Sequence, residues 1–246
     1  MPHGEVVFVR LIAHRGASAH APENTMASFR LALGMGAKAI ELDVHQTRDG
    51  ELVVLHDDDF KRVGRRRLRV RDLAWGEVSS LEVGAWFDPR FKGERVPRLA
   101  EVMDLVEGQA ELHIELKRGS RAYPGIEERL VELVGRRRAW AWAPLSSFDH
   151  GALYRLRSLA PRARLGYLLG LTPWRRAARE LAELGAESLN LSLRQVDERK
   201  IQECHRKGRR VLVYTVNTLR DLERLRRMGV DGVFTNFPEL DSHESL

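Results

Sequence analysis

The stretch RVLVYTVNTLRDLERLRRMGVDGVFTN (residues 210–236) holds one complete repeat of the pattern that decides the fold. Its two ends, RVLVYTV and DGVFTN, are rich in β-branched and aromatic residues, as strands are. Between them Leu219, Leu222 and Leu225 recur at helical spacing, and Gly229 ends the segment as a C-cap would. A strand, a helix and a second strand in this order predict two parallel strands joined by a crossover helix.

The same alternation runs through nearly the whole chain of 246 residues. Eight segments predict strands: VVFVRLIAH (6–14), AKAIELDVHQT (37–47), ELHIELK (111–117), APLSSF (143–148), RLGYLL (164–169), SLNLS (188–192), RVLVYTV (210–216) and DGVFTN (231–236). Helical patterns lie between most of them, as in residues 25–36, 99–108, 123–138 and 218–229. Eight such repeats predict an α/β fold, a (β/α)8 TIM barrel, in one domain over residues 1–246. The alternative is an open doubly wound sheet, but no GxGxxG follows a strand.

One connection, from about residue 48 to 97, is unusually long for a loop. It contains ELVVLHDDD (51–59), which predicts a short extra strand, and the basic stretch KRVGRRRLRVRDL (61–73). We interpret the segment as a small insertion after the second strand, at the mouth of the barrel. The basic stretch is typical of a solvated hairpin, and attraction of an anionic substrate is the alternative.

Composition limits the class of protein and of partner. The formal net charge of +6 is compatible with anionic partners, but the arginines are spread along the chain, as on an ordinary solvated surface. Cys204 is the only cysteine, so no disulfide forms within the chain and a reduced compartment is expected. The first residues resemble a strand rather than a signal peptide, and no apolar run is long enough to span a membrane. We therefore expect a cytoplasmic protein without stable membrane insertion.

Carboxylates alternate with apolar residues along two of the predicted strands. Glu41 and Asp43 share one face of AIELDVHQT (39–47), and Glu115 lies on one face of ELHIELK (111–117). Three inward carboxylates would repel one another in a barrel of low dielectric constant, and a divalent cation would remove that conflict. Oxygen ligands suit Mg²⁺ or Ca²⁺. The alternative is that the three are ordinary salt-bridged barrel residues.

Two histidines and two cations adjoin these carboxylates at predicted strand ends. His14 and Arg15 end the first strand, His56 ends the extra strand, and Lys117 ends the third. Two imidazoles can serve as general base and general acid near neutral pH. Together with a divalent ion, they predict cleavage of a phosphodiester.

The residues after Arg15 are open to more than one interpretation. Gly16 is expected to keep the backbone clear of the substrate. Asn24, in the PENT turn (22–25), is expected as a helix N-cap, and orientation of the site by Glu23 or Asn24 is an equal alternative.

Five stretches together resemble the glycerophosphodiester phosphodiesterase family, a group of (β/α)8 barrels among the phospholipase-C-like phosphodiesterases. They are IAHRGASAHAPENTMASF, GAKAIELDVHQTRDGELVVLHDDDFKRV, ELHIELK, LVYTVNT and GVDGVFTNFP, in family order from residue 12 to 238. The resemblance implies hydrolysis of glycerophosphodiesters to sn-glycerol 3-phosphate and an alcohol, with Ca²⁺ or Mg²⁺. It also implies the role of each site residue: His14 and His56 as acid and base, Glu41, Asp43 and Glu115 as metal ligands, and Arg15 and Lys117 as phosphate-binding cations.

The chain departs from the family pattern at two positions. Asn236 stands where an aspartate is common and Tyr214 where a tryptophan is frequent. We expect both positions to affect the rim of the pocket and the head-group preference, and to leave the chemistry intact.

The resemblance leaves other functions to compare. A lysophospholipase D-type activity, or another phosphodiesterase activity, would use the same barrel on a different substrate. A nucleic-acid-binding protein would fit the charge, but no nucleic-acid-binding motif supports it, and we expect a small-molecule substrate. The sequence does not choose between the two ions, decide which histidine is the acid, or give the oligomeric state.

Overall fold

All eight predicted strands form in the computed structural model, which describes residues 9–241. Residues 6–8, which we expected to begin the first strand, lie outside this range, as does the start of the chain. The strands of the barrel are β1 (Arg10–His14), β2 (Ala39–Gln46), β4 (Glu111–Leu116), β5 (Leu145–Ser147), β6 (Leu165–Leu168), β7 (Ser188–Ser192), β8 (Arg210–Tyr214) and β9 (Gly232–Thr235).

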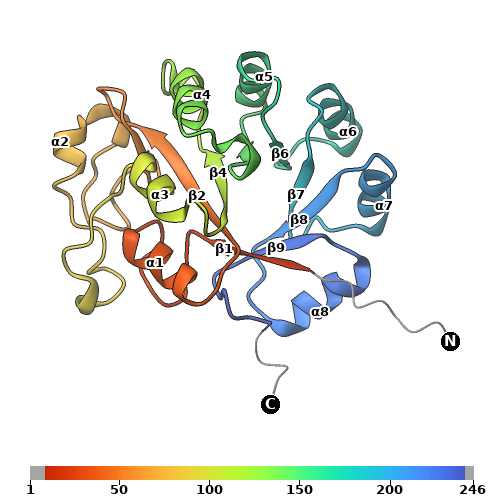
Figure 1. Ribbon diagram of the computed structural model, residues 1–246, viewed down its shortest axis with the longest axis horizontal. Helices are drawn as coiled ribbons and strands as arrows, with labels where there is room; N and C mark the ends of the chain where they lie inside the picture. Colours follow the sequence, from red (N-terminus) through yellow and green to blue (C-terminus); the bar gives the residue numbers. More distant parts are fainter. Residues whose placement is uncertain (1–8, 242–246) are drawn as a thin grey trace.

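These eight strands close into a parallel barrel. Their order is β1-β9-β8-β7-β6-β5-β4-β2, and β1 also pairs with β2, which joins the two ends of the sheet. The helices surround the strands in chain order (Figure 1). The predicted (β/α)8 TIM barrel is confirmed, and the open sheet is excluded.

Seven helices of eight or more residues follow the strands within the described range: α1 (Met26–Gly34), α3 (Leu99–Val106), α4 (Ile126–Arg136), α5 (His150–Leu159), α6 (Trp174–Glu183), α7 (Glu198–Arg206) and α8 (Leu219–Met228). In α8, Leu222 and Leu225 are buried and Gly229 is the left-handed C-cap, as predicted. Leu219 is more exposed because it begins the helix at the rim of the barrel. Among residues 9–241, no helix has the length and apolar character needed to cross a bilayer.

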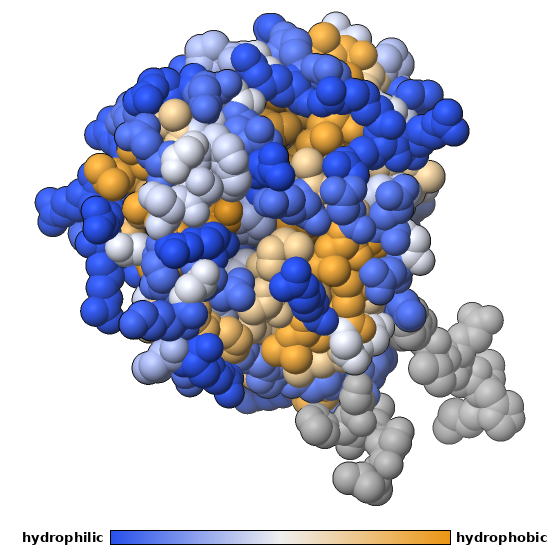
Figure 2. All heavy atoms as spheres, turned by 60° about the vertical axis from the view of Figure 1, so that its left-hand side comes forward, coloured by the Kyte–Doolittle hydropathy of each residue, from blue (hydrophilic) through white to orange (hydrophobic). Residues whose placement is uncertain are grey.

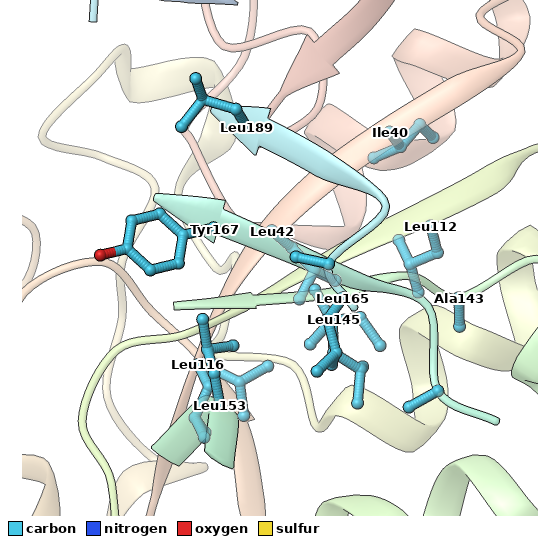
Figure 3. Packing of buried hydrophobic residues seen from close by; sticks show 14 of the residues in the cluster. Ile40, Leu42, Leu112, Leu116, Ala143, Leu145, Leu153, Leu165, Tyr167 and Leu189 are labelled. Carbon is cyan, nitrogen blue, oxygen red and sulfur yellow. The ribbon is translucent and has the colours of Figure 1, made fainter. Parts of the chain in front are cut away.

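The core between strands and helices follows the predicted alternation. Ile40, Leu42 and Val44 of β2 are fully buried in the main hydrophobic cluster, together with Leu112 and Leu116 of β4 (Figure 3). Burial of each such side chain stabilises the folded state by about 1.5–3 kcal/mol. Successive side chains of a strand point to opposite faces. Since the apolar side chains face the helices, the polar side chains between them point into the barrel.

The long connection after β2 folds around a hydrophobic cluster separate from the main core. It contains the predicted extra strand, β3 (Leu52–Val54), antiparallel to β2, and the short helices η1 (Val70–Asp72), α2 (Trp75–Val78) and η2 (Pro89–Phe91). Buried members of the cluster include Phe60, Val63 and Val70. This segment lies outside α1 and α3 (Figure 1), and the face that carries it is largely hydrophilic at its surface (Figure 2).

The basic stretch 61–73 forms less regular structure than the hairpin we expected. Its antiparallel pairing is limited to one isolated bridge between Asp59 and Arg69, followed by η1. Arg65 adopts a left-handed conformation (φ 54°), which turns the chain there. The arginines 65–67 are exposed, as predicted for a solvated segment.

Candidate active site

Parallel register brings the predicted site residues to one end of the barrel. In the β1–β2 pair, His14 lies opposite Glu41, and in the β2–β4 pair, Asp43 lies opposite Glu115. Lys117 directly follows the last residue of β4. Since the carboxyl ends of parallel strands meet at one rim, the five side chains share the end where active sites of such barrels form.

The three predicted carboxylates form one cluster. One oxygen each from Glu41, Asp43 and Glu115 lies within 4.8 Å of the others. Lys117 Nζ lies 3.1 Å from Asp43 Oδ1 and 2.8 Å from Glu115 Oε1. Arg15 Nε lies 3.1 Å from Asp43 Oδ2. Two cationic side chains therefore face three carboxylates, and the formal charge of this group remains negative.

The pKa directions reflect this imbalance. Burial and the neighbouring carboxylates raise the pKa of Glu41 well above its usual value, and burial together with Asp43 raises the pKa of Glu115. Burial also acts to raise the pKa of Asp43, but Lys117 and Arg15 outweigh it and hold that pKa below its ordinary range. Asp43, the central carboxylate of the three, is thus the one that Lys117 and Arg15 keep ionised.

The His14 side chain, at the end of β1, is held by Asn236, the residue that follows β9. Its Nδ1 lies 2.8 Å from Asn236 Oδ1, and its Nε2 lies 4.0 Å from Glu41 Oε2. Burial, and next the charge of Arg15, lower the pKa of His14 to about 4. The ring is therefore neutral at pH 7, and because the Asn236 oxygen only accepts, its proton belongs on Nδ1.

His56 is held in a similar way by a carboxylate. Its Nδ1 lies 2.7 Å from Asp57 Oδ1. Burial is the largest influence on His56 and lowers its pKa. In both histidines a fixed acceptor occupies Nδ1 and leaves Nε2 for another partner.

The turn between β1 and α1 adds contacts that the sequence left open. Arg15 and Asn24 both adopt left-handed backbone conformations, with φ of 58° and 57°. The Asn24 amide donates to Asp43 Oδ2 at 2.8 Å, and Arg15 Nη1 donates to Glu23 Oε1 at 2.9 Å. The N-cap of α1 is Thr25, not Asn24 as expected, because the left-handed turn directs Asn24 to the carboxylate instead.

Gly16 has a packing function that the sequence did not reveal. Its φ is 82°, and a Cβ at this position would lie 2.5–2.8 Å from atoms of Ser28. Gly16 therefore allows the turn to pack against α1, and clearance of the backbone from the substrate stays a prediction.

A cavity of about 220 Å³ opens at this rim. One side is polar and includes His14, Arg15, His56 and Lys117. The side formed by β5 to β9 carries the apolar side chains of the cavity, Phe148, Leu168, Tyr214 and Phe234, beside the polar Ser146, Asn190 and Thr215. Tyr214, expected at the rim of the pocket, thus lines the cavity together with the aromatic side chains of Phe148 and Phe234.

Residues 14–240 match the family model described as the glycerophosphoryl diester phosphodiesterase family. The chain belongs to this family. Over 93% of its length it is 38% identical to a glycerophosphodiester phosphodiesterase of Caldanaerobacter subterraneus subsp. tengcongensis, of which the match covers 94%. It is 32% identical to a glycerophosphodiester phosphodiesterase of Bacillus subtilis, over 93% of this chain and 84% of that protein. The protein is therefore a phosphodiesterase of the glycerophosphodiester class.

Solved structures agree with this glycerophosphodiester phosphodiesterase fold. A phosphodiesterase of Oleispira antarctica, solved in complex with the product sn-glycerol-3-phosphate, has a TM-score of 0.88 and 28% identity over 95% of each chain. A glycerophosphodiester phosphodiesterase from Agrobacterium tumefaciens has a TM-score of 0.82 and 29% identity, over 95% of this chain and 98% of that one.

In this member of the family, all seven predicted site residues gather at the same rim, through the cavity or the carboxylate cluster. Sequence reasoning missed two contacts of the histidines. Asn236, which we expected to affect only the rim of the pocket, contacts the His14 ring directly. Asp57 contacts the His56 ring. The second was open to inference because Asp57 follows His56 in the chain, whereas the first depends on β9 lying beside β1.

Proposed function

We propose that the protein hydrolyses glycerophosphodiesters to sn-glycerol 3-phosphate and an alcohol in a reaction that requires a divalent cation. Membership of the family supports hydrolysis of glycerophosphodiesters. The product bound by the Oleispira antarctica relative supports the position of the cleaved bond. The single observation that carries the metal requirement is the cluster of three carboxylates with oxygens within 4.8 Å of one another.

The residues present fit Mg²⁺ or Ca²⁺. Glu41, Asp43 and Glu115 supply only oxygen ligands, which hard divalent cations prefer. The raised pKa values of Glu41 and Glu115 support the same conclusion, because the cations of the protein do not balance all three charges. When bound, such an ion supplies positive charge that stabilises the phosphoryl oxygens of the transition state.

The remaining polar side chains would bind the phosphate and move protons. Arg15 and Lys117 carry the positive charge that a phosphodiester anion requires on the polar side of the cavity. One of His14 and His56 would accept a proton from the nucleophile as its bond to phosphorus forms; the nucleophile is water, or a substrate hydroxyl whose cyclic phosphate product water then opens. The other would donate a proton to the leaving alkoxide as the old P–O bond breaks.

A hydrolysis assay tests the proposal. Purified protein would be given glycerophosphocholine, glycerophosphoethanolamine and glycerophosphoglycerol, and release of sn-glycerol 3-phosphate would be measured with and without EDTA. We expect activity that EDTA removes and that Mg²⁺ or Ca²⁺ restores. His14→Ala and His56→Ala should each lower turnover by about 100-fold or more. Full activity after thorough chelation would exclude the metal requirement. A fully active histidine variant would exclude that histidine as a general acid or base.

A lysophospholipase D-type activity is the second candidate. The apolar side of the cavity supports it, and so do Phe148, 42% exposed at the mouth, and the fully exposed Leu171 on the neighbouring loop. The backbone at Gly170, next to Leu171, passes close to the Phe148 ring, since a Cβ at Gly170 would lie 3.6 Å from that ring. Lysophosphatidylcholine added to the same assay would decide: faster hydrolysis than for glycerophosphocholine would favour the lipid substrate.

A further inference from the structure

Arg62, in the segment after β2, joins two carboxylates that lie in different parts of the chain. Its Nη1 and Nη2 each donate to Glu23, at 2.8 Å to Oε2 and 2.8 Å to Oε1. Its Nε donates to Asp57 Oδ2 at 2.8 Å. A single guanidinium therefore bridges the turn before α1 and the loop after β3.

Each of those carboxylates holds one residue of the proposed site. Glu23 Oε1 also accepts from Arg15 Nη1 at 2.9 Å. Asp57 uses its other oxygen, Oδ1, for His56 Nδ1 at 2.7 Å. The contacts form a continuous chain from Arg15 through Glu23, Arg62 and Asp57 to His56.

Arg62 is not among the residues that line the cavity, and neither are Glu23 and Asp57. Arg62 is therefore placed to act on the reaction through the side chains that it holds. Outer groups of this kind fix the orientation and the tautomer of the residues that meet the substrate.

The long segment after β2 supports Arg62 in this position. The neighbouring Phe60 and Val63 are buried in the segment's own hydrophobic cluster. The guanidinium carbon lies 5.5 Å from the ring centroid of Trp86, whose indole donates to the Val83 carbonyl at 2.8 Å. The cluster thus anchors the backbone around Arg62, while the Trp86 ring packs against its guanidinium.

The geometry requires arginine rather than a general positive charge. Three nitrogens of one planar group each donate to a carboxylate oxygen, in two directions. A lysine carries one ammonium on a flexible stem and cannot hold both carboxylates in this arrangement.

We propose that Arg62 is a positioning residue for phosphodiester hydrolysis, which orients His56 through Asp57 and Arg15 through Glu23. This inference rests on the proposed function, in which His56 moves a proton and Arg15 binds phosphate. It assigns a purpose to the segment after β2: that segment supplies the group that keeps both side chains in place.

The kinetic test compares Arg62→Met and Arg62→Lys with a matched control in the full-length protein. Arg48→Met breaks an exposed ion pair of the same segment, between Arg48 Nη2 and Glu77 Oε2 at 3.1 Å, away from the cavity. We expect both Arg62 variants to fold, and to lose about 10- to 100-fold in kcat with a much smaller change in KM. Lysine should not rescue the activity, and Arg48→Met should be indistinguishable from wild type.

A double-mutant cycle tests the path to His56. If Arg62 acts through Asp57, then Arg62→Met should cost much less in the Asp57→Asn background than in the wild type. Independent, multiplicative losses would overturn that path, and so would rescue of kcat by Arg62→Lys.

A readout without substrate separates this inference from the proposed function. Ring nitrogen NMR of His56, assigned by comparison with His56→Gln, should show one tautomer with the proton on Nδ1 in the wild type. In Arg62→Met we expect a mixture of tautomers. If the wild type hydrolyses no phosphodiester, the proposed function fails, and the NMR comparison then decides only whether Arg62 orients His56. Unchanged His56 signals in a folded Arg62→Met protein would overturn it.

Discussion

Glu41→Gln should make the metal-free protein more stable while it removes most of the response to metal. The substitution keeps the size of the side chain and an oxygen that can accept from the backbone N–H of Arg15, 3.1 Å from Glu41 Oε2. It removes one of three charges whose oxygens lie within 4.8 Å. Since the pKa of Glu41 is raised, its ionised form opposes folding, and a neutral amide does not.

The size of the effect follows from the distance. Two unit charges 4.8 Å apart repel by about 3 kcal/mol at an effective dielectric constant of about 20. Attraction to Lys117 and Arg15 offsets part of this repulsion, so we expect a net gain of about 1–2 kcal/mol in the free energy of unfolding. In a chain of this length, that gain raises Tm by about 2–8 °C.

The assay is thermal unfolding of both proteins in EDTA and in saturating Mg²⁺ or Ca²⁺. A ligand at 100 times its Kd adds about 2.7 kcal/mol to the stability of the wild type, and the variant should gain much less. Glu132→Gln, on the exposed face of α4, is the control and should change neither value. A Glu41→Gln protein that is less stable in EDTA and responds fully to metal would refute the reasoning.

Three further predictions concern other parts of the molecule. Asn236→Ala removes the acceptor 2.8 Å from His14 Nδ1, so kcat should fall by about 10- to 100-fold with little loss of stability; wild-type kinetics would contradict this. Gly16→Ala combines a left-handed φ of 82° with contacts to Ser28 as short as 2.5 Å, so denaturant unfolding should show a loss of about 2 kcal/mol or more. Burial acts to raise the pKa of Glu180, but its hydrogen bonds from a tyrosine and an arginine outweigh burial and lower it. The stability that this carboxylate contributes is therefore present above pH of about 4.3, its unfolded pKa, and is lost in more acidic solution. The difference in the free energy of unfolding between wild type and Glu180→Gln should become smaller below that pH. A difference that stays constant with pH would contradict a lowered pKa of Glu180.

The pattern of residues along the chain was enough to predict the strands, the face that each presents and the location of the carboxylates. Glu41 and Asp43 are two residues apart, and a strand alternates with that period, so both were predictable as inward neighbours. Ile40, before Glu41, and Leu42, between the two carboxylates, predicted the opposite, helix-facing side in the same way, and both are fully buried. Local periodicity requires no knowledge of distant residues, which is why these predictions held.

The tertiary structure alone decided which side chains hold the site residues. Asn236 meets His14 across 222 positions because closure of the barrel places β9 beside β1. Arg62 reaches Glu23 across 39 positions because the segment after β2 folds around a cluster of its own. Asn24 turns to the central carboxylate through a left-handed backbone conformation, which the helix-capping preference of asparagine did not reveal. Such contacts depend on how distant segments pack, and no local period in the sequence encodes them.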